Sequence, residues 1–131
     1  MVSVPILKKT LSIVFQRHKN VLFSYLFGSM AKGEVSPLSD IDIAVYLDNI
    51  DPNAIFDMKL SLHADICRAL KMNNVDMVIL NTLNNDMLID DIIRHGIVIY
   101  DRNTALREHF EIMAIHRAID FKTQRLAVMG V

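Results

Sequence analysis

A run of seven residues at positions 21–27 is almost entirely apolar, aromatic or branched, and it stops abruptly at Gly28. A run of that length suits a strand better than a helix, and its lack of polar alternation is typical of a central strand buried on both faces. The segment therefore predicts a sheet at the centre of the molecule. It also places Gly28 and Ser29 at the end of that strand.

The rest of the chain shows helical and strand patterns in a regular order. Apolar spacing predicts a first helix ending near position 20, and a turn and loop over 30–39 lead into a second strand at 40–47. A helix to position 71, a strand at 75–80, a further helix, a strand at 97–100 and a helix over 103–126 follow. This order predicts an α/β (α+β) fold, a small mixed sheet flanked by helices, as one domain over residues 1–131.

Three features of these helices make specific predictions. The helix that ends at position 71 is expected to have an apolar face containing Phe56, Leu60, Cys67 and Leu70. Gly96 is expected to stop the next helix in a left-handed conformation, because glycine adopts positive φ without steric cost. The last helix is apolar over a wider arc than one core contact requires, which predicts a protein-binding surface and a homo-oligomer formed through that helix.

The lengths of the connections predict how the strands are arranged. Ten residues separate Ser29 from Asp40, which is short enough to join antiparallel neighbours. The helix before position 75 is long enough to bring the third strand parallel to the second. The end of the first strand then lies beside the starts of the second and third. This edge of the sheet is expected to collect Gly28, Ser29, Asp40, Asp42 and Asp76.

Acidic residues at this edge indicate a metal site. Because side chains in a strand alternate with a period of two, Asp40 and Asp42 project from the same face, about 6.6 Å apart along the strand. Carboxylates crowded without a counter-charge raise one another's pKa and cost stability, so a divalent cation is their natural partner. An all-oxygen ligand set favours Mg²⁺ or Mn²⁺ over zinc. We expect Asp40, Asp42 and Asp76 to bind such an ion.

The turn after the first strand indicates a phosphate site. The backbone N–H groups of Gly28 and Ser29, with the Ser29 hydroxyl, are placed to hold the oxygens of a triphosphate. Lys32 lies one turn further on and adds positive charge toward the same group, with a solvent-facing lysine as the alternative. A lone Asp-x-Asp or Gly-Ser is usually turn or capping chemistry, and a buried or capping aspartate is the alternative for Asp76. The order of these motifs, each next to an apolar strand, makes the combination specific.

The sequence around these residues resembles a known family. The run Leu26-Phe27-Gly28-Ser29, nine further residues, and then Ser39-Asp40-Ile41-Asp42-Ile43-Ala44-Val45 are similar to the signature of the DNA polymerase β-type nucleotidyltransferase superfamily. Within it, the chain resembles the minimal nucleotidyltransferase (MNT) branch. The resemblance extends in length and element order over essentially the whole chain. It includes residues 75–78, which resemble the segment bearing the family's third carboxylate, and residues 96–100, which resemble its final short strand.

The MNT branch often occurs as the antitoxin paired with a HEPN-domain ribonuclease toxin. The resemblance therefore implies Mg²⁺-dependent transfer of AMP from ATP to a tyrosine of such a toxin, which silences it. By the same resemblance, Asp40 and Asp42 would hold two Mg²⁺ ions, and Asp76 would complete one metal site and help to activate the acceptor hydroxyl. Gly28 and Ser29 would hold the phosphates of the donor.

The chain departs from the family at two positions. Met30 stands where many relatives have arginine after Gly-Ser, and Lys32 stands where a second arginine is frequent. The departure weakens or rearranges the grip on the triphosphate. Two alternatives to the adenylyltransferase antitoxin stay open. One is a non-catalytic antitoxin that neutralises its partner by forming a complex. The other is a nucleotidyltransferase for a small hydroxylated acceptor such as an aminoglycoside, although a chain this short lacks the usual acceptor-binding domain unless it dimerises.

Composition argues against other classes of protein. The chain has 131 residues and a formal net charge of −1, so it has no global positive field for nucleic acid, and no direct nucleic-acid binding is expected. Cys67 is the only cysteine, which excludes an internal disulfide and fits a reducing cytoplasm. No apolar run approaches the roughly 18 to 20 residues needed to cross a bilayer, and the first twenty residues lack a signal-peptide cleavage site. We therefore expect a cytoplasmic protein.

Overall fold

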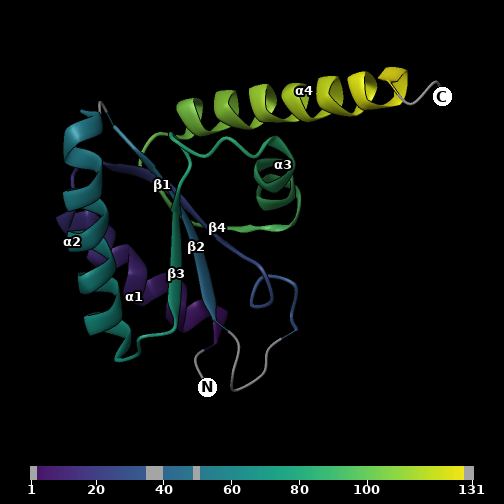
Figure 1. The fold of residues 1–131 in the computed structure, drawn as a ribbon. Helices are drawn as coiled ribbons and strands as arrows, with labels where there is room; N and C mark the ends of the chain where they lie inside the picture. Colours follow the sequence, from purple (N-terminus) through teal and green to yellow (C-terminus); the bar gives the residue numbers. More distant parts are fainter. Residues whose placement is uncertain (1–2, 35–39, 49–50, 129–131) are drawn as a thin grey trace.

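The computed structural model describes residues 3–34, 40–48 and 51–128. Within them a four-stranded mixed sheet lies between two layers of helices (Figure 1). The elements are α1 Val4–Arg17, β1 Val21–Phe27, β2 Ile41–Leu47, α2 Pro52–Leu70, β3 Val75–Ile79, α3 Asp86–His95, β4 Ile97–Asp101 and α4 Thr104–Val128. Their order and approximate bounds are those predicted, and the α/β (α+β) fold class is confirmed. The predicted loop at 35–39 lies outside the described residues.

The sheet has the strand order β3-β2-β1-β4. Strand β1 pairs antiparallel with both β2 and β4, whereas β2 and β3 are parallel. Both predictions from connection length are therefore confirmed. Because β1 and β2 are central, they are covered on both faces, which explains the nearly continuous apolar sequence of β1.

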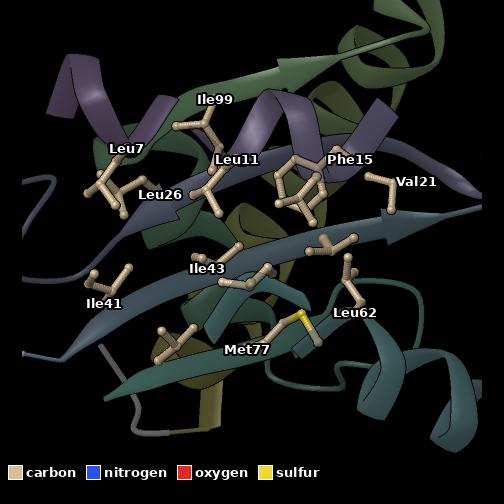
Figure 2. Close-up of a cluster of buried hydrophobic side chains, with 14 of the residues drawn as sticks. Leu7, Leu11, Phe15, Val21, Leu26, Ile41, Ile43, Leu62, Met77 and Ile99 are labelled. Carbon is tan, nitrogen blue, oxygen red and sulfur yellow. The ribbon is translucent and has the colours of Figure 1, made fainter. Parts of the chain in front are cut away.

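Helices α1 and α2 cover one face of the sheet. Leu7, Leu11 and Phe15 of α1 are fully buried at helical spacing and pack with inward-facing residues of the strands (Figure 2). The predicted apolar face of α2 is partly wrong, because the buried positions are Leu62, Ile66 and Leu70. The two residues predicted for the N-terminal half of this face are largely in solvent: Phe56 is 67 % exposed and Leu60 is 53 % exposed.

The error on α2 has a geometric cause. At 100° per residue, Phe56 and Leu60 lie roughly 80° to 120° round the helix from Ile66, which is at the middle of the buried stripe. The sequence contains two adjoining apolar stripes, and periodicity alone does not show which one meets the sheet.

Helices α3 and α4 cover the opposite face. Their core contains Phe23 and Tyr25 of β1 together with Ile92 of α3, and Phe110 of α4 packs against it. The ring of Tyr46 stacks on Phe23 at 4.7 Å between centroids. The C-terminal half of α4 extends past α3, away from the sheet (Figure 1). In the described part of the chain, no helix is both long and apolar enough to cross a membrane.

The end of α3 differs from the prediction. Gly96 has φ −75° and ψ 166°, which is extended rather than left-handed backbone. The chain enters β4 directly after α3, so an extended residue is needed there. Space explains the glycine, since a Cβ would overlap the carbonyl oxygen of Ile92 and lie 3.1 Å from that of Leu26. The left-handed helix end in the described chain is Lys71, with φ 56°, after α2.

Candidate active site

Two carboxylates meet where the parallel strands begin. In the register of β2 and β3, Asp42 lies directly opposite Asp76. Their sequence neighbours Ile41, Ile43, Val75 and Met77 are buried in the core under α1 and α2. Because side chains alternate, Asp42 and Asp76 project from the other face of the sheet, the one on which α3 and α4 lie. Strand pairing therefore places the two acids side by side.

The carboxyl of Asp42 is in an unfavourable environment for a negative charge. Burial raises its pKa above the ordinary range, and the nearby Asp76 and Asp40 carboxylates raise it further. Asp40 is exposed and immediately precedes β2, two residues from Asp42, so alternation places both on one face. Within the described residues, no ion pair involves Asp42 or Asp76. The cluster is thus left with uncompensated negative charge.

The turn after β1 lies against this cluster. Phe27 is paired with Asp42 across β1 and β2, so the next residue, Gly28, is beside the Asp42 side chain. Gly28 has φ 71°, and a Cβ there would overlap the Asp42 carboxylate and lie 3.1 Å from its Cγ. Glycine is therefore required both by the backbone conformation and by the close approach of the acid. Ser29 follows at once and is half-buried.

Hydrogen bonds fix the turn itself. The N–H of Lys32 donates to the Gly28 carbonyl at 3.2 Å, and the N–H of Glu34 donates to the Ser29 carbonyl at 2.9 Å. These bonds close a helical turn at the end of β1, which is the arrangement that the sequence predicted. A turn of this kind can present backbone N–H groups to an anion.

Lys32 points toward α3 rather than toward the carboxylates. Its Nζ lies 3.8 Å from Oδ1 of Asp91, and the side chain of Lys32 is 43 % exposed. The same Asp91 oxygen pairs with Nδ1 of His95 at 3.1 Å. In this structure Lys32 is therefore partly exposed and paired with an acid of α3. Met30 is buried in the core at 6 % exposure, so the position where relatives often have arginine is used here for packing.

The residues at this edge fit a divalent cation as partial ligands. No group of three or more His, Cys, Asp or Glu side chains in the described residues forms a ready-made metal cage. Asp42 and Asp76, with Asp40 beside them, provide an oxygen-only donor set that has no ion-pair partner among the described residues, which suits Mg²⁺. Mg²⁺ commonly takes one or two carboxylates and completes its shell with water and substrate phosphates, so an incomplete protein set is expected for it.

Several polar contacts could not be found from the sequence. His18 pairs with Asp65 at 2.7 Å, although 47 residues separate them. The contact between Lys32 and Asp91, which are 59 positions apart in the chain, could not be predicted from the sequence either. The i,i+4 spacing of Asp91 and His95 on α3 is the one available clue, because such pairs face each other on a helix. It predicts their contact but not the contact with Lys32.

Comparison with known proteins identifies the class. Residues 9–105 match the family model described as polymerase beta, nucleotidyltransferase. The match covers most of the chain, which therefore belongs to the polymerase β-type nucleotidyltransferase family. No curated protein matches it.

The fold is shared with solved toxin–antitoxin structures. A crystal structure of a toxin–antitoxin with AMP-PNP matches with a TM-score of 0.75 and 23 % identity over 94 % of this chain and 95 % of the other. A structure of a tri-AMPylated HEPN toxin of Shewanella oneidensis in complex with MNT antitoxin matches with a TM-score of 0.71 and 20 % identity, over 96 % and 95 % of the two chains. The MntA–HepT structure gives 0.70 and 21 % identity over 96 % of each chain. This member of the nucleotidyltransferase family thus has the fold of the MNT antitoxins over nearly its full length.

Proposed function

We propose that this protein is an antitoxin that transfers AMP from ATP to a tyrosine hydroxyl of a HEPN-domain toxin. One observation carries the proposal: Asp42 and Asp76 are paired across β2 and β3, against a glycine turn that has no room for a side chain. Membership of the nucleotidyltransferase family supports the reaction type. The relatives crystallised with AMP-PNP, and with an AMPylated HEPN toxin, support the donor and the acceptor.

Each residue has a role in this proposal. The N–H groups of Gly28 and Ser29, with the Ser29 hydroxyl, hold the phosphates of ATP, and Asp40, Asp42 and Asp76 are the ligands for two Mg²⁺ ions. The bound metal supplies charge neutralisation and orientation for the phosphates. Lys32 contributes positive charge to the triphosphate after leaving Asp91, from which it is separated by 3.8 Å in a partly exposed pair.

The transfer is a displacement at the α-phosphorus of ATP. The tyrosine oxygen forms a bond to that phosphorus, the bond to the bridging oxygen of the β-phosphate breaks, and pyrophosphate leaves with the bonding electrons. The tyrosine proton passes to the Asp76 carboxylate, which is exposed at the start of β3 and so accessible to an acceptor from solution.

The test uses the full chain, a HEPN protein encoded beside it, Mg²⁺ and ATP labelled in the α-phosphate. The proposal predicts label on the toxin, located at a tyrosine by peptide mass spectrometry, and no label with Asp42→Asn. Asp57→Asn, an exposed acid on α2, serves as the matched control and should keep full transfer. Undiminished transfer by Asp42→Asn would reject the assigned site.

A non-catalytic antitoxin is the second candidate. Two observations favour it: Met30 is buried where relatives often have arginine, and Lys32 is paired with Asp91. In that case the variant Asp40→Asn/Asp42→Asn would silence the toxin as well as the wild type does, without ATP. Loss of neutralisation in that variant, with the complex still formed, would leave only the enzymatic function.

A further inference from the structure

Strand β3 lies at an outer edge of the sheet, and β2 is its one neighbour in the described strand order. The backbone groups of Asn74 and Leu80, at the two ends of β3, bond to β2. Because backbone groups alternate sides along a strand, three residues between them direct their N–H and C=O groups away from β2. These residues are Val75, Met77 and Ile79.

The two outer residues of this edge have bonded carbonyls. Nε2 of His63 in α2 donates to the carbonyl of Val75 at 2.9 Å, and the N–H of Thr82 donates to that of Ile79 at 3.2 Å. The N–H and C=O of Met77 lie between them and have no strand beside them in the described sheet. An unpaired edge of this kind accepts an extended chain as an additional strand.

An exposed apolar stripe of α2 lies along the same edge. At 100° per residue, His63 is about 60° round the helix from the buried Ile66. Phe56 and Leu60 are roughly 20° and 60° further in the same direction. Because His63 contacts the outward carbonyl of Val75, these two largely exposed side chains project beyond β3.

The stripe has about the length of the strand. A short turn joins α2 to β3, so the two elements run in opposite directions, side by side (Figure 1). From the level of His63, Leu60 and Phe56 are roughly 4.5 Å and 10.5 Å along the helix. Strand β3 spans about 13 Å in the same direction. We call the outward backbone of β3, together with Phe56 and Leu60, the β3 edge site.

The face of β3 turned away from α2 carries Asp76, which is exposed. We infer that the β3 edge site binds the tyrosine-bearing segment of the acceptor protein as an added strand, an inference that rests on the proposed function. Because side chains alternate along a strand, the tyrosine faces Asp76 while the residues before and after it pack on Phe56 and Leu60. The site thus selects an extended segment with apolar residues on both sides of its tyrosine.

Charge favours an acceptor segment over β3 of a second copy. Antiparallel pairing of two β3 strands about Met77 brings the Asp76 carboxylates of the two copies close together, each with Asp42 beside it. Like charges oppose that pairing, whereas a neutral or basic segment meets no such repulsion. An acceptor strand also delivers its hydroxyl to the acid that takes the proton in the proposed reaction.

The first experiment measures AMP transfer over a series of concentrations of the HEPN protein encoded beside this chain. Leu60→Asp should raise the KM for that protein at least about tenfold, because it places a charge against an apolar contact. The loss should appear in KM rather than in kcat. Ile13→Asp on α1 is the matched control, since Ile13 is 51 % exposed against 53 % for Leu60, and it should keep the wild-type KM. Equal KM values for Leu60→Asp and wild type overturn the inference.

The second experiment is amide hydrogen exchange of the full chain with and without the HEPN protein, in the absence of ATP. The amides of Met77 and Ile79 should exchange more slowly in the complex, together with the tyrosine-bearing segment of the partner. Transfer without this protection overturns the inference and leaves the proposed function standing. Protection without transfer supports the docking and rejects the proposed function. Protection that grows with the concentration of this chain alone identifies a second copy as the occupant and overturns the inference.

Discussion

The acidic side chains of this protein lie in two contrasting electrostatic environments. At the start of β2 and β3, Asp42 faces Asp76 and Asp40, and burial and both neighbours raise its pKa. Where β4 meets α4, Asp101 and Glu111 each accept a hydrogen bond of 2.8 Å from Arg107. Compensated acids of this second kind hold elements together. Uncompensated acids cost stability, so a cluster of them indicates a place where a cation is bound during function.

The largest expected effect separates activity from stability at Asp42. If the proposed function holds, Asp42→Asn should lower AMP transfer at least about a hundredfold, because it would remove one of the proposed ligands of Mg²⁺. It should also raise the free energy of unfolding at neutral pH. The sign follows from the raised pKa, since a carboxyl whose folded pKa is above its unfolded value destabilises the fold once the pH exceeds both.

Chemical denaturation of wild type and Asp42→Asn at pH 7, with and without Mg²⁺, measures the stability effect. Without the metal, the variant should be the more stable protein, and addition of Mg²⁺ should stabilise only the wild type. Asp57→Asn should have the stability of the wild type, both without Mg²⁺ and with it. If Asp42→Asn were less stable than wild type without Mg²⁺, Asp42 would belong with the structural acids, and the comparison would fail.

The compensated group should respond in the opposite way. Arg107→Met should lower the free energy of unfolding by about 2 kcal/mol, because it leaves the partly buried Asp101 and Glu111 without their shared cation. One oxygen of Asp101, Oδ1, is already buried without a hydrogen-bond partner within the described structure, so the loss is not easily absorbed.

Thermal melting of Arg107→Met measures this loss, and Arg17→Met, an exposed arginine at the end of α1, is the control. Tyr25 contributes to the same network by donating to Oε2 of Glu111 at 3.1 Å. Tyr25→Phe should therefore destabilise the protein less than Arg107→Met does. Equal melting temperatures for wild type and Arg107→Met would show that the compensated acids do not stabilise the fold.

A third prediction compares two glycines of the same turn. Gly28 and Gly33 have φ values of 71° and 75°, so alanine at either position incurs backbone strain of about 1 kcal/mol. Only at Gly28 would the new Cβ overlap the Asp42 carboxylate, whereas nothing lies within 4 Å at Gly33. Gly28→Ala should therefore lose AMP transfer as well as stability.

Gly33→Ala should lose stability only, and by the smaller amount. Denaturation curves and the label-transfer assay on both variants separate backbone strain from displacement of Asp42. Equal activity in the two variants would mean that contact between the turn and the acid does not matter for catalysis.

Much of the site could be predicted because local rules determine it. Strand alternation places Asp40 and Asp42 on one face, and the connection lengths set the strand directions that pair Asp42 with Asp76. The break in β1 at Gly28 marked the turn, since a positive φ is rarely adopted by other residues. These signals depend on neighbours in sequence or on adjacent elements.

The predictions were wrong or missing at positions where tertiary contacts determine which side chain is buried or what it touches. Two apolar stripes adjoin on α2, and only packing on the sheet determines that Ile66 rather than Phe56 is buried. Gly96 was predicted from conformational preference, whereas its actual requirement is the closeness of the Ile92 and Leu26 carbonyls. The contact between Lys32 and Asp91 depends on how α3 lies beside the turn, which no spacing in the sequence reports.

The smallest predicted effect concerns Asp65, a compensated acid near the surface. Its pKa is lowered, first by the hydrogen bond with His18 and further by Arg68, while its limited burial acts in the opposite direction. A carboxyl with a depressed folded pKa stabilises the fold above its ordinary value of 3.8, and that contribution is lost as the pH falls through the folded pKa. Since the pair is partly exposed, the contribution is below about 1 kcal/mol.

Denaturation of wild type and Asp65→Asn across a pH series from neutral to acid measures this contribution. The wild type should be slightly more stable at pH 6, and the difference should shrink below pH 4 as Asp65 takes up its proton. Asp42→Asn should show the reverse, with the variant's advantage at neutral pH disappearing in acid, because the wild-type Asp42 is then neutral. If the stability differences for Asp65→Asn and Asp42→Asn change in opposite directions with pH, the two aspartates belong to the two kinds of acid distinguished above. If they change in the same direction, that distinction is lost.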